Sequence, residues 1–250
     1  MADIAVLLKQ VPDTNAKIVV SGGRVDEGAV NKWSMSPYDE YALETALTMG
    51  GSITAITCGP ARAKKLLTDA AAVGATELMH IVVDDLTTLD SNQVSSILAA
   101  AVTKTGASVV FCGKQAADTN AGSTGPGVAQ KLGAACVTMV SELSGDANGF
   151  TALRPSSEGM ERVSVAAPCV IAFDKMTTEL RRPNVKGIMM AKKKAVDTLS
   201  PADLGVDLGA SDVSLQNQAP PAEKPAGQKF EGAENVPTVV SKLRDEAKVL

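Results

Sequence analysis

Short apolar runs alternate with longer amphipathic runs along the first 141 residues of the chain. The short runs are typical of buried strands, and the longer ones place apolar residues at helical spacing, as at Tyr41, Ala42, Leu43, Ala46 and Leu47. This order predicts an α/β fold, a doubly wound and mostly parallel sheet with helices on both faces. The expected strands are Asp3–Leu8, Ser52–Cys58, Leu78–Val83, Ala107–Cys112 and Ala135–Val140, and the expected helices are Pro37–Met49, Pro60–Val73, Ser91–Lys104 and Pro126–Leu132.

The alternation stops after residue 141. Two alternating runs within residues 147–167 predict a hairpin, Pro168–Asp174 predicts a last strand of the main sheet, and an irregular polar stretch follows. Residues 199–237 contain five prolines, which favours an extended arm, and residues 239–248 predict a short amphipathic helix. We therefore divide the chain into a domain of residues 1–198 and a C-terminal arm and helix of residues 199–250. A helix this short needs another surface, its own domain or a partner subunit.

Composition and charge exclude several classes of function. Hydrophobic residues make up 45% of the chain but aromatic residues only 3%, so aliphatic side chains must fill the core. The net charge is −4, and the one basic run is Lys192–Lys194, which is either a solvated face or a surface that steers an acidic partner. Nucleic-acid binding needs a concentrated basic surface and is not expected. No apolar run is long enough to cross a membrane and no signal peptide is recognised, so we expect a cytoplasmic protein.

Residues for covalent catalysis are scarce. The four cysteines form no CxxC motif and are expected to be buried small side chains, and no metal site is expected. The single histidine, His80, alternates with apolar residues in an expected strand, which favours a structural role. The chain offers few residues that could pair as a nucleophile and a base, so we predict no catalytic residue.

Three turns at strand ends lead into helices, and helix N-termini bind phosphates. In the turn Cys58–Arg62 no acid competes and Arg62 adds positive charge. At Ser36, Pro37 and Asp39 we expect a capping box, which makes that end acidic and self-satisfied. The turn of residues 122–128 has no acid after the cap and is the best phosphate cradle. It offers the hydroxyls of Ser123 and Thr124, glycines at 125 and 127 for close backbone approach, and upstream Asp118 and Asn120 for a ribose or an amine. The alternative is ordinary capping, with Thr124 as the cap and Pro126 at the first helical position.

Several motifs together carry a family resemblance over nearly the whole chain. They are Val6–Asp13, Met35–Glu44, Cys58–Pro60, Gly113–Asp118 with Thr124–Pro126, Gly187–Lys194 and Ala202–Val206. In order and spacing the chain resembles the beta subunit of electron-transfer flavoprotein. The resemblance implies a Rossmann-like adenine-nucleotide-binding domain and a heterodimer with an alpha subunit that carries most of a redox FAD. The beta subunit would hold a buried AMP, or a second FAD in electron-bifurcating members.

The resemblance also implies which residues meet these ligands. Thr14 and Tyr38 would approach the redox flavin. Residues 176–190 would form a partner-recognition segment, with Glu179, Arg181 and Val185 as its recognition residues. The implied nucleotide contacts are Leu7, Ser36, Pro37, Tyr38, Asp39, Cys58, Gly113, Lys114, Gln115, Asp118, Asn120, Gly122, Ser123, Thr124 and Gly125.

We therefore expect an electron carrier subunit that passes electrons from flavin dehydrogenases, such as the acyl-CoA dehydrogenases of fatty acid oxidation, to a membrane quinone oxidoreductase. One alternative is a subunit of a bifurcating flavoprotein, in which case the complex is an enzyme in the fuller sense. A remote alternative is a free-standing nucleotide-binding regulator. Thr124-Gly125 is typical of AMP-type members, whereas Gly125-Pro126 is shared with bifurcating ones. Thr178–Arg181 keeps only the Glu and Arg of the family's Asn-Glu-Pro-Arg, which leaves the partner open.

Overall fold

The computed structural model describes residues 3–224 and 226–250. The chain divides into two compact units, Met1–Gln218 and Ala219–Leu250. The first unit holds all the strands, and the second holds the last helix.

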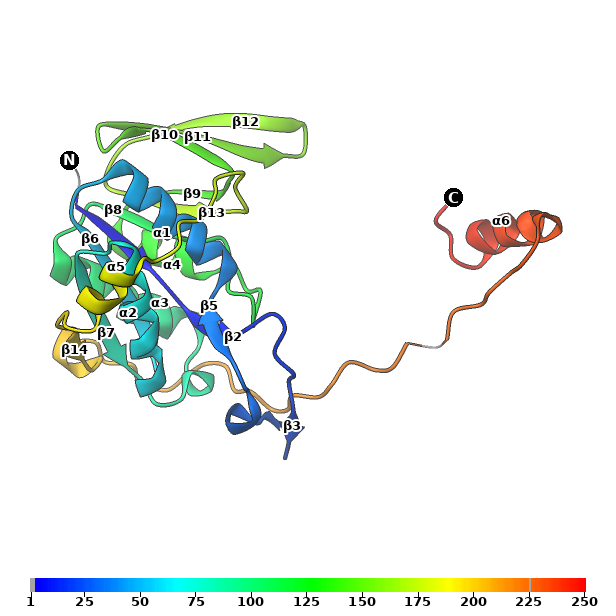
Figure 1. Cartoon of the computed structure of the whole chain (residues 1–250), viewed down its shortest axis with the longest axis horizontal. Coiled ribbons are helices and arrows are strands. Elements are labelled where there is room, and N and C mark those ends of the chain that lie inside the picture. Colours follow the sequence, from blue (N-terminus) through cyan, green and yellow to red (C-terminus); the bar gives the residue numbers. More distant parts are fainter. Residues whose placement is uncertain (1–2, 225) are drawn as a thin grey trace. The chain divides into compact units, whose positions relative to one another are not determined.

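A seven-stranded parallel sheet forms the centre of the first unit (Figure 1). Its strand order is β14-β7-β6-β1-β8-β13-β9, and every neighbouring pair is parallel. The predicted fold class is therefore confirmed, and the edge strand β14 is an addition that the sequence pattern did not predict. The strands are β1 (Ile4–Leu7), β6 (Ile53–Gly59), β7 (Glu77–Val82), β8 (Val109–Gly113), β9 (Ala135–Val140), β13 (Cys169–Phe173) and β14 (Asp197–Leu199).

Helices cover both faces of this sheet. On one face, α1 (Pro37–Met49) and α2 (Lys64–Val73) bury their apolar side chains against β1, β6 and β8. On the other face, α3 (Ser91–Thr105) and α4 (Thr124–Leu132) do the same. A further short helix, α5 (Val185–Ala191), lies outside this layer next to α2. The sheet is thus buried on both sides, which suits its Val-, Ile- and Ala-rich strands.

An antiparallel sheet of three strands joins the same core at the β9 end. It consists of β10 (Glu142–Asp146), β11 (Gly149–Ser156) and β12 (Gly159–Val165), so the predicted hairpin is confirmed and gains a strand. Phe150 from this sheet packs edge-on against Phe111 of β8, which packs edge-on against Phe173 of β13 at 5.0 Å between ring centroids. These three rings are almost completely buried and tie the two sheets together.

Two short ribbons follow β1. β2 (Gln10–Pro12) pairs antiparallel with β5 (Trp33–Met35), and between them β3 (Val20–Ser21) pairs with β4 (Arg24–Val25). Gly22 and Gly23 have φ angles of 58° and 75°, the left-handed conformation that a two-residue hairpin turn requires. Short 3₁₀ turns complete the chain: η1 (Glu27–Ala29), η2 (Ala61–Ala63), η3 (Leu86–Thr88), η4 (Ala202–Leu204) and η5 (Ala233–Asn235).

The first part of the C-terminal arm belongs to the first unit. After β14, the Gln93 side chain donates to the Leu208 carbonyl at 2.8 Å, and the Gln218 backbone N–H donates to the Gly23 carbonyl at 2.8 Å. These bonds explain why the unit extends to Gln218 and does not end near 198. In the second unit, α6 (Val236–Asp245) buries none of its residues. No helix among the described residues is long and apolar enough to cross a membrane.

Candidate functional site

The order in which strands are added to the sheet reverses between β1 and β8, which are parallel neighbours. From β1 the chain proceeds toward β6, and from β8 it proceeds toward β13 and β9. The loops at the carboxyl ends of these two strands therefore part, and ligands of such sheets bind at this position. A cavity of about 200 Å³ lies here. Its walls are the end of β1, the loop after β8, the first residues of α4 and the first turns of α3.

Asp39 closes one wall of the cavity. Its carboxylate accepts the backbone N–H of Lys9 at 2.7 Å and that of Gly113 at 2.9 Å, so it bridges the ends of β1 and β8. The capping box expected at this helix start is wrong, because Asp39 turns to the sheet. A Cβ on Gly113 would lie 2.5 Å from Asp39 Oδ1, so only glycine fits there. Burial raises the pKa of Asp39 to about 7, although both N–H bonds act to lower it.

The rim of the cavity carries charged groups that are already paired. Lys9 Nζ lies 2.7 Å from Asp118, and Lys114 Nζ lies 2.8 Å from Asp174. Lys114 Nζ also sits 4.9 Å from the centre of the Tyr38 ring. Both pairs are only partly exposed. The two lysines thus bring positive charge to the rim, and each is held in place by a carboxylate.

The N-terminus of α4 has no side-chain cap. The helix begins at Thr124, two residues before the expected Pro126, and Ser123 stands at the cap position without bonding a helix N–H. Its hydroxyl instead lies 3.1 Å from that of Ser91, at the start of α3. Both Ser123 and Thr124 line the cavity, and there is no acidic side chain in the first turn. The arrangement leaves N–H groups and the positive helix end available to an anion.

The glycines of this turn have a different task from the one that their sequence suggests. A Cβ on Gly125 would lie 3.0 Å from Cys112 Sγ and 3.3 Å from Ala172 Cβ, and one on Gly127 would collide with the Ser95 hydroxyl. Gly125 and Gly127 therefore let α4 approach the sheet and α3 closely.

Burial also decides the roles of the cysteines and of His80. Cys58, Cys112 and Cys169 are buried as expected, and Cys58 lines the cavity with its thiol pKa raised to about 12 by burial. Cys136 is exposed, so the expectation of burial is wrong for it, because β9 is an edge strand. The Nε2 atom of His80 lies 3.0 Å from the Gly59 carbonyl oxygen, and the ring is almost completely buried. This bears out its structural role.

The structure brings most of the predicted nucleotide contacts together. The ones that line the cavity are Leu7, Asp39, Cys58, Gly113, Lys114, Gln115, Gly122, Ser123 and Thr124. Ser36, Pro37, Tyr38, Asp118, Asn120, Gly125 and Thr14 do not line it. Ser36 supports the loop after β8, since its hydroxyl accepts the Ala117 N–H at 3.3 Å. Thr14 is exposed in the segment before β3.

Sequence reasoning missed the wall that α3 contributes. Asp90, Ser91, Val94 and Leu98 line the cavity together with Lys9. The Asp90 side chain accepts the Gln93 N–H in a complete capping box, at the start of the helix that was expected at Ser91–Lys104. The capping motif does not predict that this helix start faces the turn after β8, because that depends on the order of the strands in the sheet.

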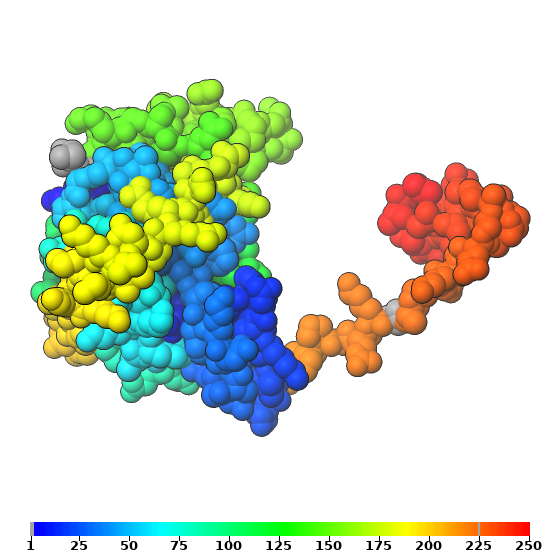
Figure 2. All heavy atoms as spheres, viewed as in Figure 1, coloured from blue at the N-terminus to red at the C-terminus, as the bar shows by residue number. Residues whose placement is uncertain are grey.

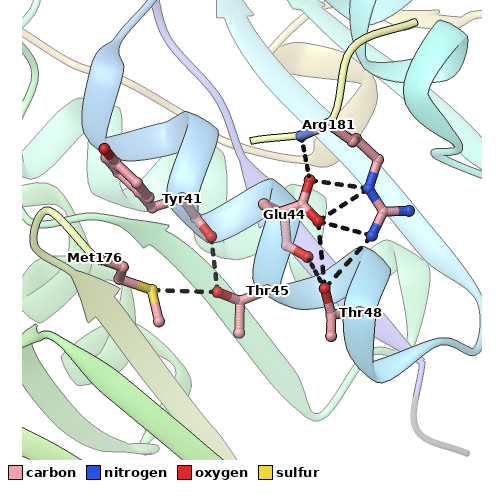
Figure 3. Close-up of polar contacts among 6 residues, drawn as sticks. All are labelled: Tyr41, Glu44, Thr45, Thr48, Met176 and Arg181. Atoms are coloured by element: carbon pink, nitrogen blue, oxygen red, sulfur yellow. Dashed lines mark hydrogen bonds and ion pairs between the residues drawn. The ribbon is translucent and has the colours of Figure 1, made fainter. Parts of the chain in front are cut away.

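The predicted recognition residues lie in the segment that contacts α1 through Arg181 and α2 through Gly187. Val185 is 76% exposed at the first position of α5, and Glu179 is also exposed. Arg181 behaves differently, because its guanidinium forms an ion pair with Glu44 of α1 at 2.7 Å (Figure 3). The three residues therefore belong to one segment but have different surroundings.

Comparison with known proteins gives the same family throughout. The family model of the electron transfer flavoprotein domain matches residues 27–204. An electron transfer flavoprotein subunit beta of Bacillus subtilis is 33% identical over 99% of this chain and 100% of its own length. The corresponding subunit of Bradyrhizobium diazoefficiens is 33% identical over 99% of both chains, and that of Homo sapiens is 31% identical over 100% of both. The chain belongs to the electron transfer flavoprotein family, among its beta subunits.

Proposed function

We propose that this chain pairs with an electron transfer flavoprotein alpha subunit and holds a structural AMP in the cavity between β1 and β8. The alpha subunit carries most of a redox FAD, which the beta subunit helps to enclose from the side of Thr14 and Tyr38. The heterodimer would carry electrons in the cytoplasm, from flavin dehydrogenases such as acyl-CoA dehydrogenases to a membrane quinone oxidoreductase. The observation that carries the nucleotide site is the uncapped, acid-free N-terminus of α4 at the wall of the cavity.

The size of the cavity favours AMP over a second FAD. Its volume is about 200 Å³. A mononucleotide needs much less room than a dinucleotide, whose second half would have to lie outside. The apolar walls from Leu7, Val94 and Leu98 suit an adenine ring, and the Gly122–Thr124 turn suits its phosphate.

The carboxylates around the cavity support a structural role for the nucleotide. Asp39 accepts two backbone N–H groups, Asp90 caps α3 by accepting the Gln93 N–H, and Asp118 at the rim is paired with Lys9. Each of them is engaged in holding the walls, and none is placed as an unpaired base. We therefore infer that the bound nucleotide stabilises the fold of the loops and is not consumed.

Residues 176–190 are the proposed docking segment for the electron donor. Val185, Met189 and Met190 are each more than 60% exposed on α5. Lys186 and Lys192 are exposed beside them. An apolar tip with a basic surround fits a partner that has an apolar recess rimmed by acidic groups. This charge pattern would also raise the rate of encounter at low salt.

The second unit is the proposed contact with the alpha subunit. Val236, Val240 and Leu243 of α6 are exposed, although they lie on one side of an amphipathic helix. A ten-residue helix is marginal by itself in water, so these side chains need a partner surface.

The test is to co-produce the chain with its alpha subunit and purify the pair through a tag on this chain. We expect a one-to-one complex that contains flavin and is reduced by a flavin dehydrogenase. Truncation after Gln218 should weaken assembly and lower flavin retention, while the first unit still folds. A full-length chain that purifies alone and without flavin in the presence of the alpha subunit would overturn the proposal.

A further inference from the structure

The docking segment is fixed to α1 by an ion pair that reaches its backbone. Arg181 Nε donates to Glu44 Oε2 at 2.9 Å and Nη2 donates to Oε1 at 2.7 Å, which is a two-pronged guanidinium–carboxylate contact (Figure 3). The Arg181 backbone N–H also donates to Glu44 Oε2 at 3.1 Å. Because the backbone itself is bound, the contact fixes the path of the chain at this point as well as the flexible side chain.

The neighbours of Glu44 on α1 extend this contact. The Thr48 hydroxyl donates to the Glu44 carbonyl at 2.9 Å and receives a 3.4 Å contact from Arg181 Nη2. The Thr45 hydroxyl, next to Glu44 in the sequence, lies 3.4 Å from the sulfur of Met176. The start of the docking segment therefore contacts α1 over about one turn of the helix.

Glu44 needs Arg181 because its side chain is buried. Only 9% of the side chain is exposed. Burial acts to raise the pKa of Glu44, but the hydrogen bonds and the charge of Arg181 outweigh it and hold the pKa below its usual value. A buried carboxylate without this partner would be costly, so the pair is maintained in the free protein.

A second fixed point lies at Asn184 and Gly187, at the start of α5. The Asn184 side chain accepts the Gly187 N–H at 2.7 Å and caps α5. A Cβ on Gly187 would collide with the Ala72 carbonyl oxygen, so α5 sits directly on α2. Figure 2 shows this part of the chain, in yellow, lying across α1 and α2. Val185 is located between the two fixed points and faces the solvent.

We propose that Glu44 and Arg181 are positioning residues that hold Val185 in its docking position before the partner arrives. The inference rests on the proposed docking function of residues 176–190. Ordering a loop on binding reduces affinity, and a preordered loop avoids that loss. Arg181 acts through Glu44 in the free protein. Its charge is neutralised by Glu44, so it contributes little to electrostatic steering of the partner.

The experiment uses the flavin-loaded complex with the alpha subunit and a flavin dehydrogenase as donor. The variants are Arg181→Gln, Arg181→Lys, Glu44→Gln and the double variant Glu44→Gln/Arg181→Gln. Arg182→Gln is the matched control, since Arg182 forms no ion pair among the described residues. The measurements are kcat and KM for the donor, flavin content, and the rate of trypsin cleavage within residues 175–192.

We expect Arg181→Gln and Glu44→Gln each to raise KM for the donor about tenfold, which corresponds to about 1.4 kcal/mol, because each removes a hydrogen-bonded ion pair. The double variant should be no worse than either single one, because both remove the same contact. Arg181→Lys keeps the charge but loses the fork, so it should also raise KM. Trypsin cleavage should accelerate in Glu44→Gln, which keeps every basic residue of the segment, while kcat and flavin content stay as in the wild type in all the variants.

Three results would overturn the inference. If Arg181→Lys behaves as the wild type and Arg182→Gln raises KM as much as Arg181→Gln, the arginines act by charge. If Glu44→Gln leaves both KM and cleavage unchanged while Val185→Ala raises KM, the segment docks without this contact. If Val185→Ala itself leaves KM unchanged, the docking function fails, and the positioning role fails with it.

Discussion

The substitution Asp39→Asn should raise the stability of this protein at pH 8 and weaken its binding of AMP. The side chain is only 5% exposed, and it faces Lys9 and Asp118 at the rim, Gly113 at the end of β8 and the thiol of Cys112. Burial disfavours its ionised form, whereas the two backbone N–H groups favour it. The net effect is a pKa raised from 3.8 to about 7. Asparagine has the same shape but cannot ionise.

The sign of the pH effect follows from this shift. A carboxyl group whose folded-state pKa is raised contributes stability that is fully present below pH 4 and is lost as the pH rises through 7. The difference is 7 − 3.8 = 3.2, and at 1.36 kcal/mol for each pKa unit it corresponds to about 4 kcal/mol. The asparagine variant lacks this titration. Its free energy of unfolding should therefore match the wild type near pH 4 and exceed it by up to about 4 kcal/mol at pH 8.

The nucleotide site should respond in the opposite direction. An ionised Asp39 accepts the N–H groups of both Lys9 and Gly113, whereas an amide accepts only one and directs its NH₂ toward the other. One end of the β1–β8 bridge is then released, so we expect AMP to bind at least tenfold more weakly at pH 8. A stability gain at the expense of a functional site is a known trade-off.

Urea unfolding of both proteins between pH 4 and 8, together with AMP titration at pH 8, measures the two effects. Comparing the difference between the variants at each pH cancels the groups that titrate alike in both. The reasoning is refuted if the asparagine variant loses stability relative to the wild type as the pH rises. That result would mean that the two N–H bonds outweigh burial and that Asp39 is ionised throughout.

Two further substitutions test the placement of the phosphate and of α4. Ser123→Asp should reduce AMP occupancy more than tenfold without loss of stability, because an acid suits a helix N-cap but repels a phosphate. The neutral control Ser123→Asn should retain AMP. Equal occupancy in the two variants, measured by high-performance chromatography of the released nucleotide, would contradict the site. Gly127→Ala should lower the free energy of unfolding, measured by thermal unfolding, by about 1–3 kcal/mol, since the added Cβ meets the Ser95 hydroxyl. The control Gly149→Ala adds a Cβ in open space and should lower it much less. Equal losses in the two variants would contradict the close packing of α3 and α4.

Hydrophobic periodicity was sufficient to predict the central sheet and its helices. The five strands expected in the first 141 residues and the last strand after Pro168 are all present, as are the four main helices. The patterns are strong because the sheet is buried on both faces and each helix has a continuous apolar side. β14 was missed because it is a three-residue edge strand in which Asp197 and Thr198 are exposed.

The candidate site was predictable only where a local motif determines it. The turn of residues 122–124 could be recognised from its hydroxyls and the missing acid, and it does line the cavity. The role of Asp39 could not, since a capping box and a bridge between β1 and β8 use the same residue, and only the tertiary structure places Gly113 beside it. The Glu44–Arg181 pair joins residues 137 positions apart, which no local pattern reports.

Counting the nucleotides in the purified heterodimer shows whether this chain holds AMP. The complex is denatured, and FAD and AMP are quantified in the supernatant against the protein concentration. We expect one FAD and one AMP for each heterodimer, with the AMP lost in Ser123→Asp and the FAD retained. Two FAD and no AMP for each heterodimer would contradict it and would make the complex a bifurcating flavoprotein.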